Sequence, residues 1–87
     1  MKPDNLTRIE GIGPKISGVL QAAGILTFAQ LADTDPARIT EILVAEDERL
    51  GRIAKPDTWP EQASLAAAGK WDELASLQNS LKGGRRA

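Results

Sequence analysis

The apolar positions of the chain repeat at helical spacing in several short segments, each bounded by proline, glycine or a capping residue. In the clearest segment, the i, i+3, i+4, i+7 positions of one helix face are Ile16, Val19, Leu20 and Ala23. Pro14 suits the first position of this helix, where its missing N–H costs no hydrogen bond. Gly24 stands where helices commonly end. The pattern therefore predicts an amphipathic helix between Pro14 and Gly24.

Similar signals predict further short helices on both sides of this one. Asn5 or Asp4 caps a short helix that carries Leu6 and Ile9. The other expected segments are 28–32 with Thr27 as cap, 36–45 after Asp35, a helical turn over 50–54, 59–68, and 71–81. Trp59 and Trp71 fall on apolar faces, so both are expected in the core. Residues 67–69 repeat the sequence of residues 22–24, which indicates a degenerate internal repeat.

These segments predict an all-α fold, a compact bundle of five or more short helices. We expect a single domain over 1–82, in which 5–34 holds a helical hairpin, 35–54 the connecting helices and 57–82 a C-terminal helical pair. A flexible tail is expected over 83–87, because this glycine- and arginine-rich segment lies at the end of the chain, where termini commonly fray.

The composition limits which disulfides, metal sites and catalytic groups the protein can contain. The 87 residues include no cysteine and no histidine, which removes disulfides, thiolate zinc sites and the commonest general base. We therefore expect no catalytic residue, no metal site and no enzyme activity. The start of the chain shows neither a signal peptide nor a membrane span, so a cytoplasmic protein without a membrane partner is expected. The net charge of −1 does not favour a nucleic-acid partner, so the prediction of such a partner depends on local geometry.

The candidate binding site is the segment Gly11-Ile12-Gly13-Pro14-Lys15. A glycine turn exposes backbone N–H groups beside a helix N-terminus, whose partial positive charge suits a phosphate. Pro14 has no N–H, so the expected site residues are Gly11, Ile12, Gly13, Lys15 and Ile16, with help from Arg8 and Lys2. Such contacts read no bases, so binding would be independent of sequence. Glu10 would repel a phosphate on its side of the turn.

The spacing of Leu6, Ile9, Gly11, Gly13, Pro14, Lys15, Leu20, Gly24-Ile25 and Leu31 resembles the helix-hairpin-helix family. Ser17 stands where that family usually has alanine. With Trp59-Pro60-Glu61-Gln62-Ala63, Gly69-Lys70-Trp71-Asp72-Glu73-Leu74 and Lys82-Gly83-Gly84-Arg85, the chain looks like bacterial proteins described as predicted flap-endonuclease-like helix-three-turn-helix proteins. The resemblance implies a SAM-like or tandem helix-hairpin-helix fold with a degenerate second motif. It also implies a monovalent cation at the hairpin; no other cofactor is expected.

The resemblance further implies a portable domain, found as a C-terminal extension of unrelated proteins that include a large-subunit ribosomal protein and a respiratory-complex subunit. We therefore expect a non-catalytic module that binds DNA, or else RNA, weakly and without sequence preference. The alternative is a protein–protein adaptor with an exposed apolar patch near Leu26, Val44 or Leu50. A nuclease is the least favoured reading, because the chain is too short for the larger α/β domain that positions two metal ions in flap nucleases.

Overall fold

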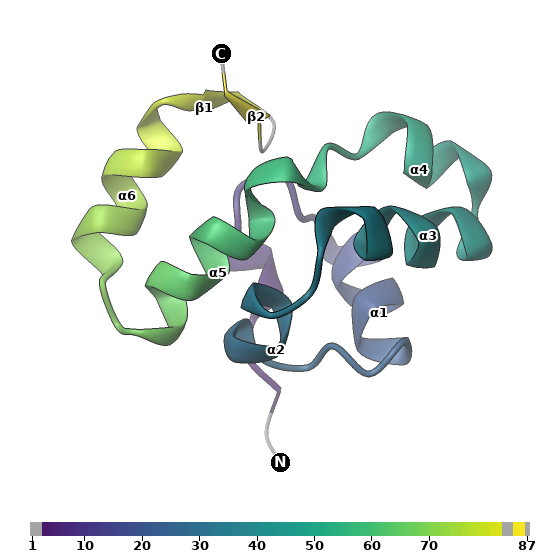
Figure 1. The fold of residues 1–87 in the computed structure, drawn as a ribbon, viewed down its shortest axis with the longest axis horizontal. Helices are drawn as coiled ribbons and strands as arrows, with labels where there is room; N and C mark the ends of the chain where they lie inside the picture. Colours follow the sequence, from purple (N-terminus) through teal and green to yellow (C-terminus); the bar gives the residue numbers. More distant parts are fainter. Residues whose placement is uncertain (1–2, 83–84, 87) are drawn as a thin grey trace.

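The computed structural model describes residues 3–82 and 85–86 and consists almost entirely of short helices (Figure 1). In chain order they are the 3-10 helix η1 (Leu6–Arg8), α1 (Pro14–Ala22), α2 (Phe28–Ala32), α3 (Pro36–Glu46), α4 (Glu48–Ile53), the 3-10 helix η2 (Pro56–Thr58), α5 (Trp59–Ala67) and α6 (Trp71–Asn79). The predicted all-α bundle is confirmed. In the part of the chain that the structure describes, no helix has the length and apolarity needed to cross a bilayer.

Local signals start most of these helices as the sequence predicted. Pro14 is the first residue of α1. Thr27 and Gln30 form a reciprocal capping box at the start of α2, which satisfies amides that the helix itself leaves unpaired. The exception is the first expected helix, which is a single 3-10 turn. It stops before Ile9, whose extended backbone leads into the hairpin while its side chain is buried in the core.

The helices α1 and α5 end in the same way, as the predicted internal likeness implies. Gly24 and Gly69 both have positive φ, 94° and 74°, and each lies just beyond its helix. The next amide then reaches back to the last turn: Ile25 N–H donates to the carbonyl of Leu20, and Lys70 N–H to that of Leu65, both at 2.9 Å. This closure uses a left-handed residue, which glycine adopts without steric cost.

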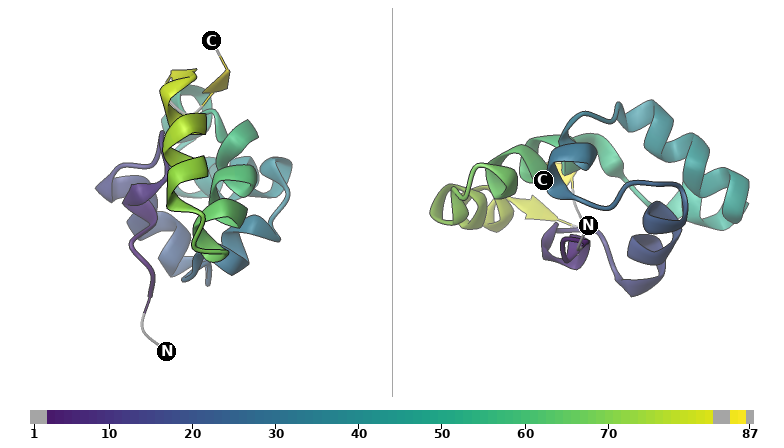
Figure 2. Two further views of the ribbon diagram at one scale, coloured as in Figure 1. Left: turned by 90° about the vertical axis from the view of Figure 1, so that its left-hand side faces the viewer. Right: turned by 90° about the horizontal axis from the view of Figure 1, so that it is seen from below.

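The molecule is flat, with extents of 34 × 33 × 20 Å, and α5 lies near its middle (Figures 1 and 2). On one side α5 packs against α2, and on another against α6, whereas α1 packs against α3 and α3 against α4. The hairpin segment nevertheless meets both C-terminal helices, because Gln62 of α5 and Gln78 of α6 form hydrogen bonds with the backbone of Glu10 and Arg8. Segments far apart in the sequence, the hairpin and the C-terminal pair, are therefore neighbours.

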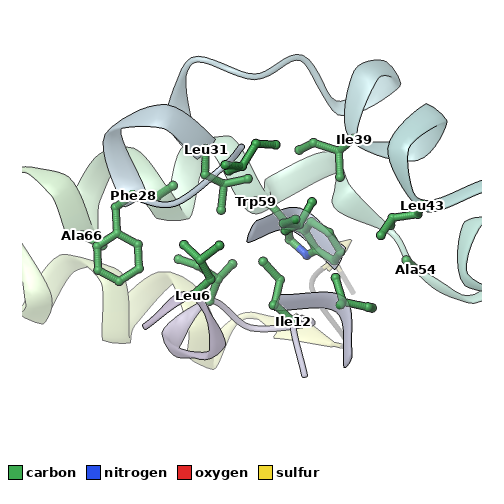
Figure 3. Close-up of a cluster of buried hydrophobic side chains, with 14 of the residues drawn as sticks. Leu6, Ile12, Phe28, Leu31, Ile39, Leu43, Ala54, Trp59 and Ala66 are labelled. Carbon is green, nitrogen blue, oxygen red and sulfur yellow. The ribbon is translucent and has the colours of Figure 1, made fainter. Parts of the chain in front are cut away.

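Trp59 fills the centre of the core, as Figure 3 shows, and is fully buried. The surrounding side chains come from nearly every element and include Leu6, Ile12, Phe28, Leu31, Ile39, Leu43, Ala54 and Ala66. Trp59 is thus the core anchor that the sequence predicted. The same prediction is wrong for Trp71, which is 40% exposed, because α6 packs only on the rim of the core, with Leu74 as its single fully enclosed residue.

The end of the chain differs from the predicted tail where it is described. Leu81–Lys82 (β1) and Arg85–Arg86 (β2) pair as a two-residue antiparallel ladder. Gly83, Gly84 and Ala87 lie outside the described residues, so the flexibility expected there stays a prediction.

Candidate functional site

The glycine hairpin connects η1 to α1 and leaves the first turn of α1 without a side-chain cap. Gly11 has φ 102°, a conformation that favours glycine. Gly13 is the N-cap residue in an extended conformation and has no side chain to accept a hydrogen bond, although its carbonyl accepts one from Ser17 N–H. The amides of Lys15 and Ile16 therefore stand at the positive end of the helix dipole without a side-chain partner, an arrangement suited to an anion.

The structure brings most of the predicted site residues together but removes one donor. Gly11, Gly13 and Lys15 are exposed, whereas the side chains of Ile12 and Ile16 are buried in the core. Ile12 was expected to offer its amide to a phosphate, but this N–H already donates to the carbonyl of Ile9 at 3.1 Å. The hydrogen bond closes the turn, so Ile12 shapes the hairpin instead. Lys2 lies outside the described residues.

Arg8 is exposed and its side chain lies against α6. The central guanidinium carbon is 4.6 Å from the centroid of the Trp71 ring. Trp71 in turn meets Phe28 edge to face, with ring centroids 5.9 Å apart and an interplanar angle of 76°. These two contacts explain why an exposed tryptophan has a fixed place: a cation lies over its ring, and a second aromatic ring meets it edge to face.

Two glutamine side chains of the C-terminal pair, Gln62 and Gln78, form a network of hydrogen bonds that holds the backbone of the hairpin. Gln62 of α5 is fully buried; its Oε1 accepts from Glu10 N–H at 2.7 Å, and its Nε2 donates to the Glu10 carbonyl at 3.2 Å. Gln62 also binds Thr58 and Gln78. Gln78 of α6 donates to the carbonyl of Arg8 at 2.7 Å. Both backbone groups of Glu10 are therefore committed, and the turn is fixed by residues 52 and 70 positions away.

This network was not predicted from the sequence. The available signal was a polar residue inside an apolar helix face: Gln62 lies between Trp59 and Ala66, at positions that otherwise point to the core. A polar side chain at such a position must find buried partners. The sequence could indicate that need, but not that the partners belong to the hairpin.

Lys15 has an acidic neighbour that the sequence did not predict. Asp47 caps α4 and accepts a hydrogen bond from the backbone N–H of Arg49 at 2.9 Å, with the Arg49 guanidinium 3.4 Å away. These two contacts hold the pKa of Asp47 below its usual value, and attraction by Lys15 lowers it further. The charge of Lys15 is therefore partly offset by a carboxylate that stays ionised at neutral pH.

The apolar surface expected of an adaptor is only partly present. Val44 is 44% exposed, but Leu26 is half-buried and Leu50 is buried, so these residues do not form one patch. A shallow groove of about 290 Å³ lies between α1 and α3. Its lining mixes small apolar side chains with charged ones: Val19, Ala22, Ala23, Ile42, Ala45, Arg38, Glu41 and Glu46.

Comparison with known families matches residues 6–67 to the family described as the RS2/RL21/YNQ2 HHH domain. The chain belongs to this family. The predicted helix-hairpin-helix motif is thereby confirmed, and the match extends through α5, well beyond the hairpin. Within the described residues, moreover, no three Asp or Glu side chains gather closely enough to hold a metal ion.

Members of the family with related sequences are longer proteins. The chain is 45% identical over 69 residues to an uncharacterized 22.9 kDa protein of Paracoccus denitrificans. It is 44% identical over 69 residues to the large ribosomal subunit protein bL21 of a Chelativorans strain, and 39% identical over 61 residues to the small ribosomal subunit protein uS2 of a Methylobacterium strain. These matches cover 76%, 76% and 70% of the chain but only 30%, 29% and 17% of the relatives. No solved structure is significantly similar.

These relatives contradict the predicted DNA-binding function. The bL21 and uS2 relatives are named as ribosomal proteins, which points to a role with the ribosome and not with DNA. The error has a physical cause: a glycine hairpin and a helix N-terminus contact phosphates, which DNA and RNA share, so the motif could not identify the nucleic acid. The implied occurrence of the domain in a large-subunit ribosomal protein is confirmed by the bL21 relatives.

Proposed function

We propose that the domain is a non-catalytic, ribosome-associated module that binds RNA phosphates at the start of α1. The supporting observation is that one domain family occurs in proteins named for both ribosomal subunits, bL21 and uS2. A domain shared by proteins of both subunits is best explained by a ligand that both subunits contain, and RNA is such a ligand. The cytoplasm is the expected location for this role.

The proposed contacts come from the exposed part of the hairpin. Gly11 and Gly13 allow close approach, Lys15 and Ile16 offer amides at the positive end of α1, and the Lys15 side chain adds a charge. Arg8 adds a second cation nearby. Backbone contacts of this kind read no bases, so they suit structured RNA of many sequences. With few cations the affinity should be low and should fall steeply with salt.

Absence of catalysis is part of the proposal. The relatives named for ribosomal proteins support a structural role, and the chain has neither histidine nor cysteine. The narrower likeness to flap-endonuclease-like proteins stays a hypothesis, because the family match is to the broader HHH domain.

The test is an NMR titration of the ¹⁵N-labelled chain with an RNA duplex of about two helical turns. At low salt we expect amide shifts at Gly13, Lys15 and Ile16 that disappear at physiological salt, and their loss in Lys15→Ala. Lys55→Ala, at an exposed lysine far along the chain, is the matched control. Absence of shifts with millimolar RNA at low salt would rule out the proposal, and the groove between α1 and α3 would become the place to look for a protein partner.

A further inference from the structure

Among the described residues, Trp71 is the largest of the exposed hydrophobic side chains. The chain has only three aromatic residues, and one of them is left 40% exposed at the first position of α6. Its ring is nevertheless held, because Phe28 meets it edge to face and the guanidinium of Arg8 stacks on it. An exposed aromatic ring with such fixed neighbours has a defined orientation on the surface.

One face of α6 contacts both the backbone and the side chain of Arg8. Trp71 and Gln78 are seven positions apart, two turns along the same helix face, with buried Leu74 between them. Gln78 binds the backbone carbonyl of Arg8 at 2.7 Å, and Trp71 stacks on its side chain. The arginine is thus fixed at two points by a helix that follows it in the sequence by more than sixty residues.

The stacked guanidinium keeps its charge and its donors. The cation–π contact with the ring is neither a hydrogen bond nor an ion pair, so it uses none of the five N–H donors of the group. The ion pairs of the described residues join Arg38 to Glu41, Arg49 to Asp47, and Lys70 to Glu73, and none of them includes Arg8. Arg8 is therefore an oriented, unneutralised cation three residues before Gly11.

We propose that Trp71 is a positioning residue that holds Arg8 for contact with an RNA phosphate beside the hairpin. The binding surface then extends from the start of α1 to the start of α6. This inference rests on the proposed function, and it adds a residue that the hairpin motif does not contain.

The test measures RNA-duplex affinity against salt concentration for Arg8→Gln, Trp71→Leu, Trp71→Phe and the double variant Arg8→Gln/Trp71→Leu. We expect Arg8→Gln to lower the slope of log affinity against log salt by about 1. Trp71→Leu should weaken binding about 2- to 5-fold, the size of an exposed cation–π contact. Trp71→Phe should retain most of the affinity, and the double variant should bind like Arg8→Gln. Arg38→Gln, at an exposed arginine of α3, is the matched control.

Two further measurements keep the outcomes separate. In the free protein, the side-chain protons of Arg8 should show an upfield ring-current shift that Trp71→Leu abolishes, and thermal unfolding should show that the variants are folded. The inference fails if this shift is absent, if Trp71→Leu binds RNA like wild type, or if it weakens binding equally with Arg8 already replaced. If the wild-type chain binds no RNA, the proposed function fails, and the inference fails with it.

Discussion

One helix in each half of the molecule ends in the same way, but these two helices begin differently. In each half a helix closes on a glycine with positive φ, at Gly24 after α1 and at Gly69 after α5. The halves differ at the start of that helix. A glycine hairpin precedes α1, whereas η2 leads directly into α5. Neither helix has a side-chain cap at its start, but the hydroxyl of Thr58 accepts a hydrogen bond from Gln62 within the second half.

This difference separates a half that carries the hairpin from a half that supports it. Aligned on their closing glycines, Ser17 of α1 and Gln62 of α5 occupy equivalent positions, and both are buried polar residues. The longer side chain of Gln62 reaches the backbone of Glu10, so the half without a hairpin fixes the hairpin of the other. The hairpin is therefore a product of both halves, although its sequence signal lies in one.

Replacing Gln62 should weaken the contact between the two halves more than any other change proposed below. Gln62→Ala leaves both backbone groups of Glu10 without their partner and removes a fully buried side chain. We expect a loss of about 3 kcal/mol in the free energy of unfolding, since the change removes the hydrogen bonds of Gln62, each worth about 0.5–1.5 kcal/mol, and leaves a space in the core. Urea titration of wild type and variant measures the difference.

The control for Gln62 is Ser64→Ala, an exposed position on the same helix. It should change stability by less than about 0.5 kcal/mol. If Gln62→Ala were equally mild, the amide network would not fix the hairpin, and the two halves would be independent at this contact.

The sequence predicted the elements whose signals are local. Pro14, Gly24, Thr27 and Asp35 act within a few residues of themselves, so the start or end of three helices could be read from spacing alone. The glycine hairpin was predicted for the same reason. Its positive φ at Gly11 is a property of the residue type and needs no distant partner.

What could not be predicted depends on contacts between the halves. Apolar spacing placed Trp71 on an inward face, but it could not show that α6 lies at the rim, where that face is only partly covered. Nor could it show that Arg8 lies over the Trp71 ring, or that the Ile12 N–H donates a hydrogen bond within the turn. These features follow from how α6 and η1 meet across the fold.

A smaller effect is expected where the two halves differ in capping. Thr27 caps α2 through a capping box, whereas Lys70, the residue before α6, provides no side-chain cap. Thr27→Ala should cost about 1 kcal/mol in the free energy of unfolding, because the amide of Gln30 loses its acceptor. Thermal or urea unfolding measures it.

Lys70→Ala is the matched change at the uncapped helix. It removes only an exposed contact with Glu73 at 3.9 Å, worth little in water. Equal losses at Thr27 and Lys70 would show that the capping difference has no energetic consequence.

The smallest effect is expected from a substitution that makes the two halves more alike. Gly18 in the middle of α1 corresponds to Ala63 in α5, which is fully buried, whereas a Cβ added at Gly18 would meet nothing within 4 Å. Gly18→Ala should therefore stabilise the protein by about 0.5–1 kcal/mol, the usual gain from alanine in a helix interior. The same variant should bind RNA like wild type, because the proposed contacts end at Ile16. Stabilisation accompanied by weaker RNA binding would instead place the ligand one turn further along α1, against the open surface that Gly18 leaves.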